Sequence, residues 1–440
     1  MNPTISPFRH AGRRLGLPSA LLALVLAHAA PAAAARWPLE AIGASEGVHE
    51  LHDLDFDAQG HALLTWDAAL RGHVPPVFGG LGLRDPAGGW QRPPDLAGVD
   101  PVTAQIHLYS RQRALLVARE GGPRGPGRRR LVVADGLSDG GFGPLVRLAD
   151  FTAGSWSAAN ASGDAIVAWT GERSPFLTVS ERRDGRGFGP PRDLAVGRSA
   201  AVALDARGDR LLAWPDGRRI AVRVRRAGGA WGPIVRFGRL PPDRDRRLSA
   251  LVAPDGRMVI TWGRDRGHCG VAARDRHGVW RSWRLERRCG PAAVGTRAAP
   301  VVPFADSRGV TYVAWTHGTR GANSVTLARV GSAGPVARAV VSRQRGAMLD
   351  DAAAGPGAAI AVTWAAVLSK TNPLLTATYA ALRRGGGAFV VDRLSPESVI
   401  VARGSRVAFQ PLTGQAVVAI PYRVGRTLAV GAAVSPPPAP

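Results

Sequence analysis

The sequence predicts an all-β fold, and the main observation behind this prediction is a phrase that recurs about every 50 residues. The clearest copy runs from Asp205 through Gly208 to Trp214 and reads as a strand end, a tight turn and an apolar strand that closes on tryptophan. A repeat of this length, made of strands and turns, is typical of a β-propeller with one copy in each blade. The positions aligned with Trp214 in successive copies are Trp66, Ala118, Trp169, Trp214, Trp262, Trp315, Trp364 and Ile420.

The fourth copy contains all the elements of one four-stranded blade. Residues 201–205 are predicted to form the innermost strand, and Gly208 supplies the positive φ that the following turn needs. Residues 210–214 form the second strand, and residues 220–226 form a third strand in which apolar and basic side chains alternate. Residues 231–237 form the outer strand, where a proline is tolerated because an edge strand does not need every N–H group in a ladder.

The two ends of the repeat region are each predicted to supply part of one blade. Residues 427–434 are predicted to be a third strand with no outer strand after it, and residues 37–42 an outer strand with no blade before it. Pairing residues 37–42 with this C-terminal strand completes an eighth blade and removes the open sheet edge. We therefore expect one domain over residues 36–434 with eight blades, followed by a proline-rich tail at residues 435–440. Seven blades is the alternative, because the second and eighth copies are degenerate.

Residues 1–35 are predicted to be a secretory signal peptide. Arg9, Arg13 and Arg14 precede an apolar run at residues 17–30, and a stretch of small residues follows it. A Sec-type signal is favoured over a twin-arginine signal. The apolar run is short and alanine-rich, so a membrane anchor is not expected. The sequence therefore predicts a protein that is secreted.

The two cysteines are predicted to form a disulfide. Cys269 and Cys289 flank a hairpin, and each lies ten residues from Val279 at its turn, which places them opposite each other. A pair of cysteines in a secreted protein favours a bridge. A metal pair completed by His268 and His277 is the alternative.

The repeated tryptophans are assigned to packing between blades rather than to ligand binding, because most of them end an apolar strand. The second-strand set is Trp169, Trp214, Trp262 and Trp315, and the outer-strand set is Trp37, Trp90, Trp231 and Trp280. Trp156 and Trp283 break this pattern and are predicted to be surface aromatics.

The chain is strongly basic, with 57 Lys+Arg against 33 Asp+Glu and a formal net charge of +24. This charge favours anionic partners, although the replacement of nearly all lysine by arginine is also typical of a GC-rich genome. Every copy has a cation in the loop between its second and third strands, and these loops share one face of a propeller. The predicted anion-binding residues are Arg71, Arg124, Arg173, Arg218, Arg219, Arg264, Arg320, Lys370 and Arg423.

An acidic segment near the start of the first copy resembles a calcium loop only in part. Asp53, Asp55 and Asp57 alternate with apolar residues, but Gly60 comes two residues late and Leu64 stands where a closing carboxylate is needed. Alternation of this kind also suits a strand that faces a polar channel. We expect no metal and no cofactor.

The copies resemble those of secreted bacterial β-propellers that are grouped loosely with sialidase-like and WD40-like propellers. The shared motifs are Asp-x-x-Gly before an apolar strand ending in Trp, and Gly-Gly-x-Trp/Phe-Gly-Pro later in the copy, as at Gly228 to Pro233. The resemblance covers residues 36–434 and implies the propeller fold. The Ser-x-Asp-x-Gly-x-x-Trp box and the Tyr–Glu pair of sialidases are absent from the sequence. The resemblance therefore implies no enzymatic activity.

Two functions are compatible with the sequence. The favoured one is a non-catalytic, monomeric binding or scaffold protein whose basic loops recognise an anionic glycan, a wall polymer or an extracellular protein, with nucleic acid disfavoured. The alternative is a glycoside hydrolase or lyase acting on an acidic sugar, in which arginines hold the substrate carboxylate. The candidate acids for that alternative are Asp53, Asp55, Asp100, Asp350 and Asp351.

Overall fold

The fold is described from a computed structural model, in which residues 35–440 form one compact unit. The predicted signal peptide lies outside the described residues. The described residues are 37–45, 48–68, 78–91, 99–109, 113–120, 130–137, 142–183, 185–238, 240, 247–263, 267–275, 277–287, 289, 301–318, 323–342, 344, 346–368, 375–395, 398–399, 404–424 and 427–438.

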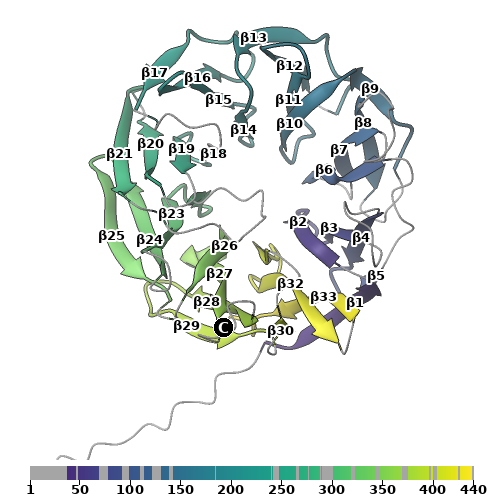
Figure 1. The fold of residues 1–440 in the computed structure, drawn as a ribbon, viewed down its shortest axis with the longest axis vertical. Coiled ribbons are helices and arrows are strands. Elements are labelled where there is room, and N and C mark those ends of the chain that lie inside the picture. The colour runs from purple at the N-terminus through teal and green to yellow at the C-terminus, as the bar shows by residue number, and fades with distance from the viewer. Residues whose placement is uncertain are drawn as a thin grey trace, which may run out of the picture. The chain divides into compact units, whose positions relative to one another are not determined.

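Eight antiparallel sheets are arranged in a ring, so the fold is an eight-bladed β-propeller (Figure 1). The prediction of four-stranded blades is confirmed, and so is the preference for eight blades over seven. The sheet of the seventh blade carries one additional short strand, β30 (Ser398–Val399), which pairs with β28. The described residues include one short 3₁₀ helix, η1 (Pro356–Ala358).

The strands fall into four sets by their position in the blade. The inner strands are β2 (Val48–Phe56), β6 (Val99–Tyr109), β10 (Thr152–Ala159), β14 (Ala201–Leu204), β18 (Arg247–Val252), β22 (Val301–Ala305), β26 (Met348–Ala354) and β31 (Arg406–Phe409). The second strands are β3 (Ala62–Ala68), β7 (Arg113–Glu120), β11 (Ala165–Gly171), β15 (Arg210–Asp216), β19 (Met258–Gly263), β23 (Thr311–His317), β27 (Ile360–Val367) and β32 (Ala416–Val424).

The third strands are β4 (Phe78–Arg84), β8 (Arg130–Leu137), β12 (Phe176–Arg182), β16 (Arg219–Arg225), β20 (Cys269–Arg274), β24 (Ser324–Gly331), β28 (Leu375–Arg383) and β33 (Thr427–Val434). The outer strands are β5 (Trp90–Gln91), β9 (Val146–Ala149), β13 (Arg192–Val196), β17 (Val235–Phe237), β21 (Trp280–Glu286), β25 (Gly334–Val340), β29 (Val390–Arg393) and β1 (Leu39–Ser45). The outer strand predicted over residues 231–237 is shorter in the structure, where β17 begins at Val235. In the fourth blade Trp231 makes only an isolated bridge to Arg225, because Gly232-Pro233 interrupts the ladder before β17 begins.

The predicted closure of the ring is confirmed. β1 pairs antiparallel with β33, from Leu39 opposite Ala433 to Ser45 opposite Leu428, with a register shift between Ala41 and Gly43. The eighth blade therefore takes its outer strand from the start of the propeller and its other three strands from the end. Closure of this kind leaves no open break between the first and last blades.

The repeated Asp-x-x-Gly phrase is explained by a side chain that caps the turn between the first two strands. Asp205 Oδ1 accepts hydrogen bonds from the backbone N–H of Arg207 at 3.0 Å and of Asp209 at 2.8 Å. Gly208 has a φ of 88°, which glycine adopts without a steric penalty. Asp306 caps the turn of the sixth blade in the same way. Asp57 does so in the first blade, which is a structural role for the third aspartate of the segment that resembles a calcium loop.

Each tryptophan predicted to end a second strand is buried between neighbouring blades. Trp214 is 1% exposed and Trp315 is 0% exposed. One apolar cluster lies between each pair of adjacent blades, and Trp214 belongs to the cluster between the third and fourth. Trp283, predicted to be a surface aromatic, is half-buried and packs against the cluster between the fifth and sixth blades.

The predicted disulfide between Cys269 and Cys289 is present, with the two Cα atoms 5.9 Å apart. The predicted register is offset, since Cys269 pairs with Glu286 in the ladder and Cys289 lies beyond the end of β21. The backbone N–H of Cys289 donates to Gly267 O at 2.8 Å, which brings the two cysteines together. Within the described residues, no helix has the length and apolar character that crossing a membrane requires.

Candidate functional site

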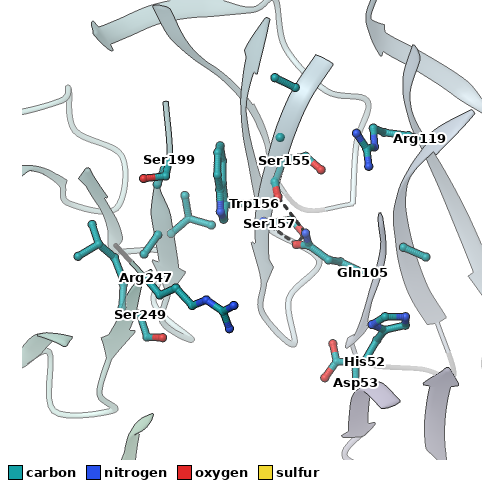
Figure 2. A pocket seen from close by; sticks show the side chains of 18 of the residues that line it. His52, Asp53, Gln105, Arg119, Ser155, Trp156, Ser157, Ser199, Arg247 and Ser249 are labelled. Carbon is teal, nitrogen blue, oxygen red and sulfur yellow. Dashed lines mark hydrogen bonds between the residues drawn. The ribbon is translucent and has the colours of Figure 1, made fainter. Parts of the chain in front are cut away.

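A cavity of about 590 Å³ lies among the inner strands β2, β6, β10, β14, β18 and β31. Its lining is rich in polar side chains, and Figure 2 shows Arg247 extending into the cavity opposite His52 and Asp53. Because the inner strands of several blades border this cavity, residues far apart in the sequence meet here. The cavity is lined by His52, Asp53, Ala104, Gln105, Arg119, residues 153–157, residues 199–202, residues 247–250 and Arg406.

Three guanidinium groups from three blades line this cavity. Arg247 and Arg406 are the first residues of the inner strands β18 and β31, and Arg119 is the penultimate residue of the second strand β7. In an antiparallel blade, the start of the inner strand and the end of the second strand lie at the same edge, as the pairing of Arg119 with Asp100 near the start of β6 illustrates. The three arginines therefore lie toward the face that carries the loops between second and third strands.

Arg406 is held in place by the backbone on both sides of the junction between the eighth and first blades. Its Nε atom donates to His52 O at 2.9 Å, and its Nη1 atom donates to Ser405 O at 3.0 Å. These bonds fix the plane of the guanidinium while it lines the cavity. A fixed planar fork is the arrangement that recognises a carboxylate, sulfate or phosphate with two parallel hydrogen bonds.

Trp156 supplies an aromatic surface to the cavity. Its half-buried indole packs against the apolar cluster between the third and fourth blades and also lines the cavity. Gly154 makes room for the ring, because a Cβ atom at this position would lie 3.0 Å from the edge of the indole. Trp156, predicted to be a surface aromatic, is thus half-buried beside the cavity, and the lining also includes the serines Ser155, Ser157, Ser199 and Ser249 (Figure 2).

A hydrogen-bonded network joins the second and third blades at the edge of the cavity. The side-chain amide of Gln105 donates to Ser155 O at 3.1 Å and accepts from Ser157 N at 2.9 Å, which fixes its orientation. The Ser157 hydroxyl donates to the same Gln105 oxygen at 2.6 Å, so its oxygen accepts from His107 Nε2 at 2.7 Å. Burial lowers the pKa of His107 to about 4, so the imidazole is neutral at neutral pH.

Three of the predicted catalytic acids join inner strands instead of facing a ligand. Asp55 accepts from Phe56 N at 2.9 Å and from Leu108 N of the next blade at 3.2 Å. Asp351 accepts from Ala352 N at 2.9 Å and from Val407 N of the next blade at 3.0 Å. Asp350 accepts from the N–H of Ser405 at 3.2 Å and from its hydroxyl at 2.9 Å.

Burial raises the pKa of each of these three carboxyl groups, to about 6 for Asp55 and Asp350. The backbone N–H donors act in the opposite direction, because they stabilise the ionised form. Asp100 lies in β6, and its side chain is outside the described residues.

Asp53 differs from the other predicted acids because it lines the cavity. The pKa of its carboxyl group is raised to about 7, mainly by burial, with the charges of Asp55 and Asp351 acting in the same direction and Arg406 opposing them. A carboxyl group with a pKa near neutrality can both accept and release a proton at physiological pH. Of the predicted acids whose side chains are described, Asp53 alone lines this cavity.

Most of the predicted anion-binding loop residues lie outside the described residues. This applies to Arg71, Arg124, Arg264, Arg320 and Lys370, and the side chain of Arg423 is also outside. Arg173, Arg218 and Arg219 are described and exposed. Arg218 lies in the connection between β15 and β16 and Arg219 opens β16, so both lie at the same edge of the blade as the cavity arginines.

Arg119, Arg247 and Arg406 are not among the site residues predicted from the sequence. A signal was available in the sequence for two of them, since Arg247 and Arg406 each stand at the first position of an inner strand. Within the described part of the chain, no group of three or more His, Cys, Asp or Glu side chains is placed to hold a metal ion.

No protein-family model matches the chain, and no curated protein matches its sequence. Solved structures do match its fold. An ulvan lyase from a polysaccharide lyase family is 11% identical, with a TM-score of 0.50, over 90% of this chain and 94% of that chain. The Dos1 propeller is 11% identical, with a TM-score of 0.53, over 89% of this chain and 95% of that chain. At this identity the likeness shows the propeller fold alone.

Proposed function

We infer that the protein is a carbohydrate-binding β-propeller that recognises acidic glycans in the cavity among its inner strands. The observation that carries this proposal is the convergence of Arg119, Arg247 and Arg406, from three different blades, on one cavity that also exposes Trp156. Guanidinium groups bind carboxylates and sulfates through paired, charge-assisted hydrogen bonds. An indole face packs against the C–H surface of a sugar ring and excludes water there.

The other predicted features are compatible with this function. The net charge of +24 attracts polyanions over a distance, and the exposed Arg218 and Arg219 lie at the same blade edge as the cavity. Export by the predicted signal peptide would place the protein among extracellular or wall polysaccharides. The disulfide between Cys269 and Cys289 is suited to an oxidising compartment.

The proposal is tested with a pair of arginine variants in the fifth blade. Arg247→Ala removes a guanidinium from the cavity, whereas Arg281→Ala makes the same change in charge on the exposed outer strand β21 of the same blade. Calorimetry with a defined oligogalacturonate, a sulfated oligosaccharide and a neutral oligosaccharide should show binding of an acidic ligand that weakens as salt rises.

We expect Arg247→Ala to weaken that binding about 10-fold or more, because a hydrogen bond to a charged group contributes roughly 1.5–3 kcal/mol. Arg281→Ala should change it less than twofold. Equal effects of the two variants would mean that only the total charge matters, and the cavity would then not be the recognition site. Equal affinity for neutral and acidic sugars would also contradict the proposal.

A further inference from the structure

The carboxyl groups around the inner strands divide into two kinds, and the division decides which chemistry the cavity can perform. Asp55, Asp350 and Asp351 accept hydrogen bonds from backbone N–H groups, and each of them bonds to the next blade. Their oxygen atoms are directed at the protein. Among the described residues that line the cavity, Asp53 is the single carboxylic acid.

This arrangement does not suit hydrolysis of a glycosidic bond by the usual pair of acids. That mechanism needs two carboxyl groups on opposite sides of the bond, separated by about 5–10 Å. The described lining supplies one such group. The described residues of the lining therefore do not supply the pair of acids that the hydrolase alternative needs.

One base together with fixed cations is what a β-elimination needs. In a uronate residue substituted at O4, the hydrogen on C5 is acidic because it lies next to the carboxylate, and negative charge moves onto that carboxylate as the hydrogen leaves. Fixed guanidinium groups stabilise this developing charge in the transition state. Arg406 is oriented by two backbone carbonyl groups and interacts electrostatically with Asp53, so a cation and a proton acceptor lie at the same end of the cavity.

We propose that the cavity catalyses β-elimination of acidic glycans, with Asp53 as the base that removes the C5 hydrogen of a uronate residue. This proposal rests on the proposed function, because the cavity must first bind the glycan. The Asp53 carboxylate takes the C5 proton, and the C5–H electron pair forms the C4=C5 double bond. The C4–O bond breaks, and its electron pair goes to the leaving oxygen. Asp53 then returns the proton to that oxygen, so the products are an unsaturated uronate and a free hydroxyl group.

The surroundings of Asp53 suit a base that works near neutral pH. Burial and the charges of Asp55 and Asp351 raise the pKa of its carboxyl group to about 7, and Arg406 opposes this shift. His52 is adjacent on the same strand, and Arg119 and Arg247 face the cavity from β7 and β18. A base with this pKa is ionised above neutral pH and is still basic enough to take a proton from carbon. The rate should therefore rise with pH up to about 7 and then level off.

The experiment compares the mature protein with Asp53→Asn and with Asp392→Asn, a matched change on the outer strand β29. Polygalacturonate, alginate and chondroitin are supplied in turn, and the ultraviolet absorbance of the C4=C5 product is followed. Binding is measured separately by calorimetry. We expect one of these polymers to yield the unsaturated product. Asp53→Asn should slow the reaction at least about 100-fold with affinity changed less than threefold, and Asp392→Asn should leave both unchanged.

The outcomes separate this proposal from the proposed function. Binding without unsaturated product on all three polymers would overturn the elimination and leave the binding function standing. New reducing ends without the ultraviolet signal would indicate hydrolysis and would also overturn it. Product formation that survives Asp53→Asn would remove Asp53 as the base. A failure to bind any acidic glycan would contradict the proposed function itself.

Discussion

Neighbouring inner strands are joined by carboxylates in one region of the ring and by a neutral network in another. Between the seventh and eighth blades, Asp350 and Asp351 bond to Ser405 and Val407. Between the second and third blades, the amide of Gln105 bonds to Ser155 and Ser157. The carboxylate joints hold the strands and also place negative charge beside the cavity, whereas the amide joint holds them without charge. Neighbouring inner strands are thus joined in two ways, and of these two joints only the carboxylate joint shifts the pKa of Asp53, through Asp351.

The largest effect is expected from breaking a carboxylate joint. Asp351→Ala would leave the N–H groups of Ala352 and Val407 without their acceptor, which should lower the free energy of unfolding by about 2–3 kcal/mol. Urea unfolding at neutral pH measures this loss. Asp351→Asn is the control, because its single amide oxygen can still accept one of the two bonds, and its loss should be about half as large. An unchanged midpoint for Asp351→Ala would mean that the joint does not stabilise the ring.

The next largest effect is expected at Asp53, where a substitution should raise the free energy of unfolding instead of lowering it. Because the pKa of Asp53 in the folded protein is raised from 3.8 to about 7, the native state binds more protons between these two values, and stability falls as pH rises through that range. Asp53→Asn removes this loss. Asp53 is half-buried, so we expect a gain of about 2 kcal/mol at pH values above 7, roughly half the limit for a shift of this size, and almost no gain near pH 4. Thermal unfolding of Asp53→Asn at the two pH values measures this gain. An equal gain at both pH values would show that the titration of Asp53 does not cause it.

A smaller effect should be seen at the neutral joint. Burial lowers the pKa of His107 from 6.5 to about 4, so the unfolded state binds more protons between these values, and stability is lost as pH falls from about 6.5 toward 4. His107→Gln keeps a side chain that can donate to Ser157 and cannot become charged. We expect it to reduce the acid-dependent loss by about 1 kcal/mol, measured as the difference in unfolding free energy between neutral and acidic pH. If the variant's unfolding free energy depends on pH as steeply as that of the unsubstituted protein, His107 does not titrate in this range.

The smallest effect is expected at the exposed loop arginines. The double change Arg218→Ala/Arg219→Ala should alter stability by less than about 0.5 kcal/mol, because both side chains are exposed. It should weaken glycan binding two- to threefold at low salt and hardly at all at high salt. A loss as large as that of Arg247→Ala would move the recognition site from the cavity to the loops.

The fold could be predicted from the sequence because the pattern of each blade is local and repeats along the chain. The capped turn at Asp205 to Gly208 and the buried tryptophan at 214 recur with a fixed spacing, and even the joining of β1 to β33 follows from counting strands. The site could not be predicted in the same way. Arg119 comes from the second blade and Arg406 from the eighth. Which side of an inner strand faces the cavity depends on register, which shifts between Leu51 and Asp53 in β2.

The pairing of β1 with β33 also determines when, during folding, the cavity can form. Leu39 is bonded to a partner at Ala433, so the join closes a loop of nearly the whole propeller and is entropically among the most costly contacts to form. Asp53 and Arg406 lie on opposite sides of the junction that this pairing seals, and Arg406 donates to the carbonyl of His52 across it. A partly assembled ring can therefore contain well-formed blades and still lack the acid–cation pair. Any chemistry that depends on this pair begins only when the ring is complete, which would make activity a sensitive reporter of the last step of folding.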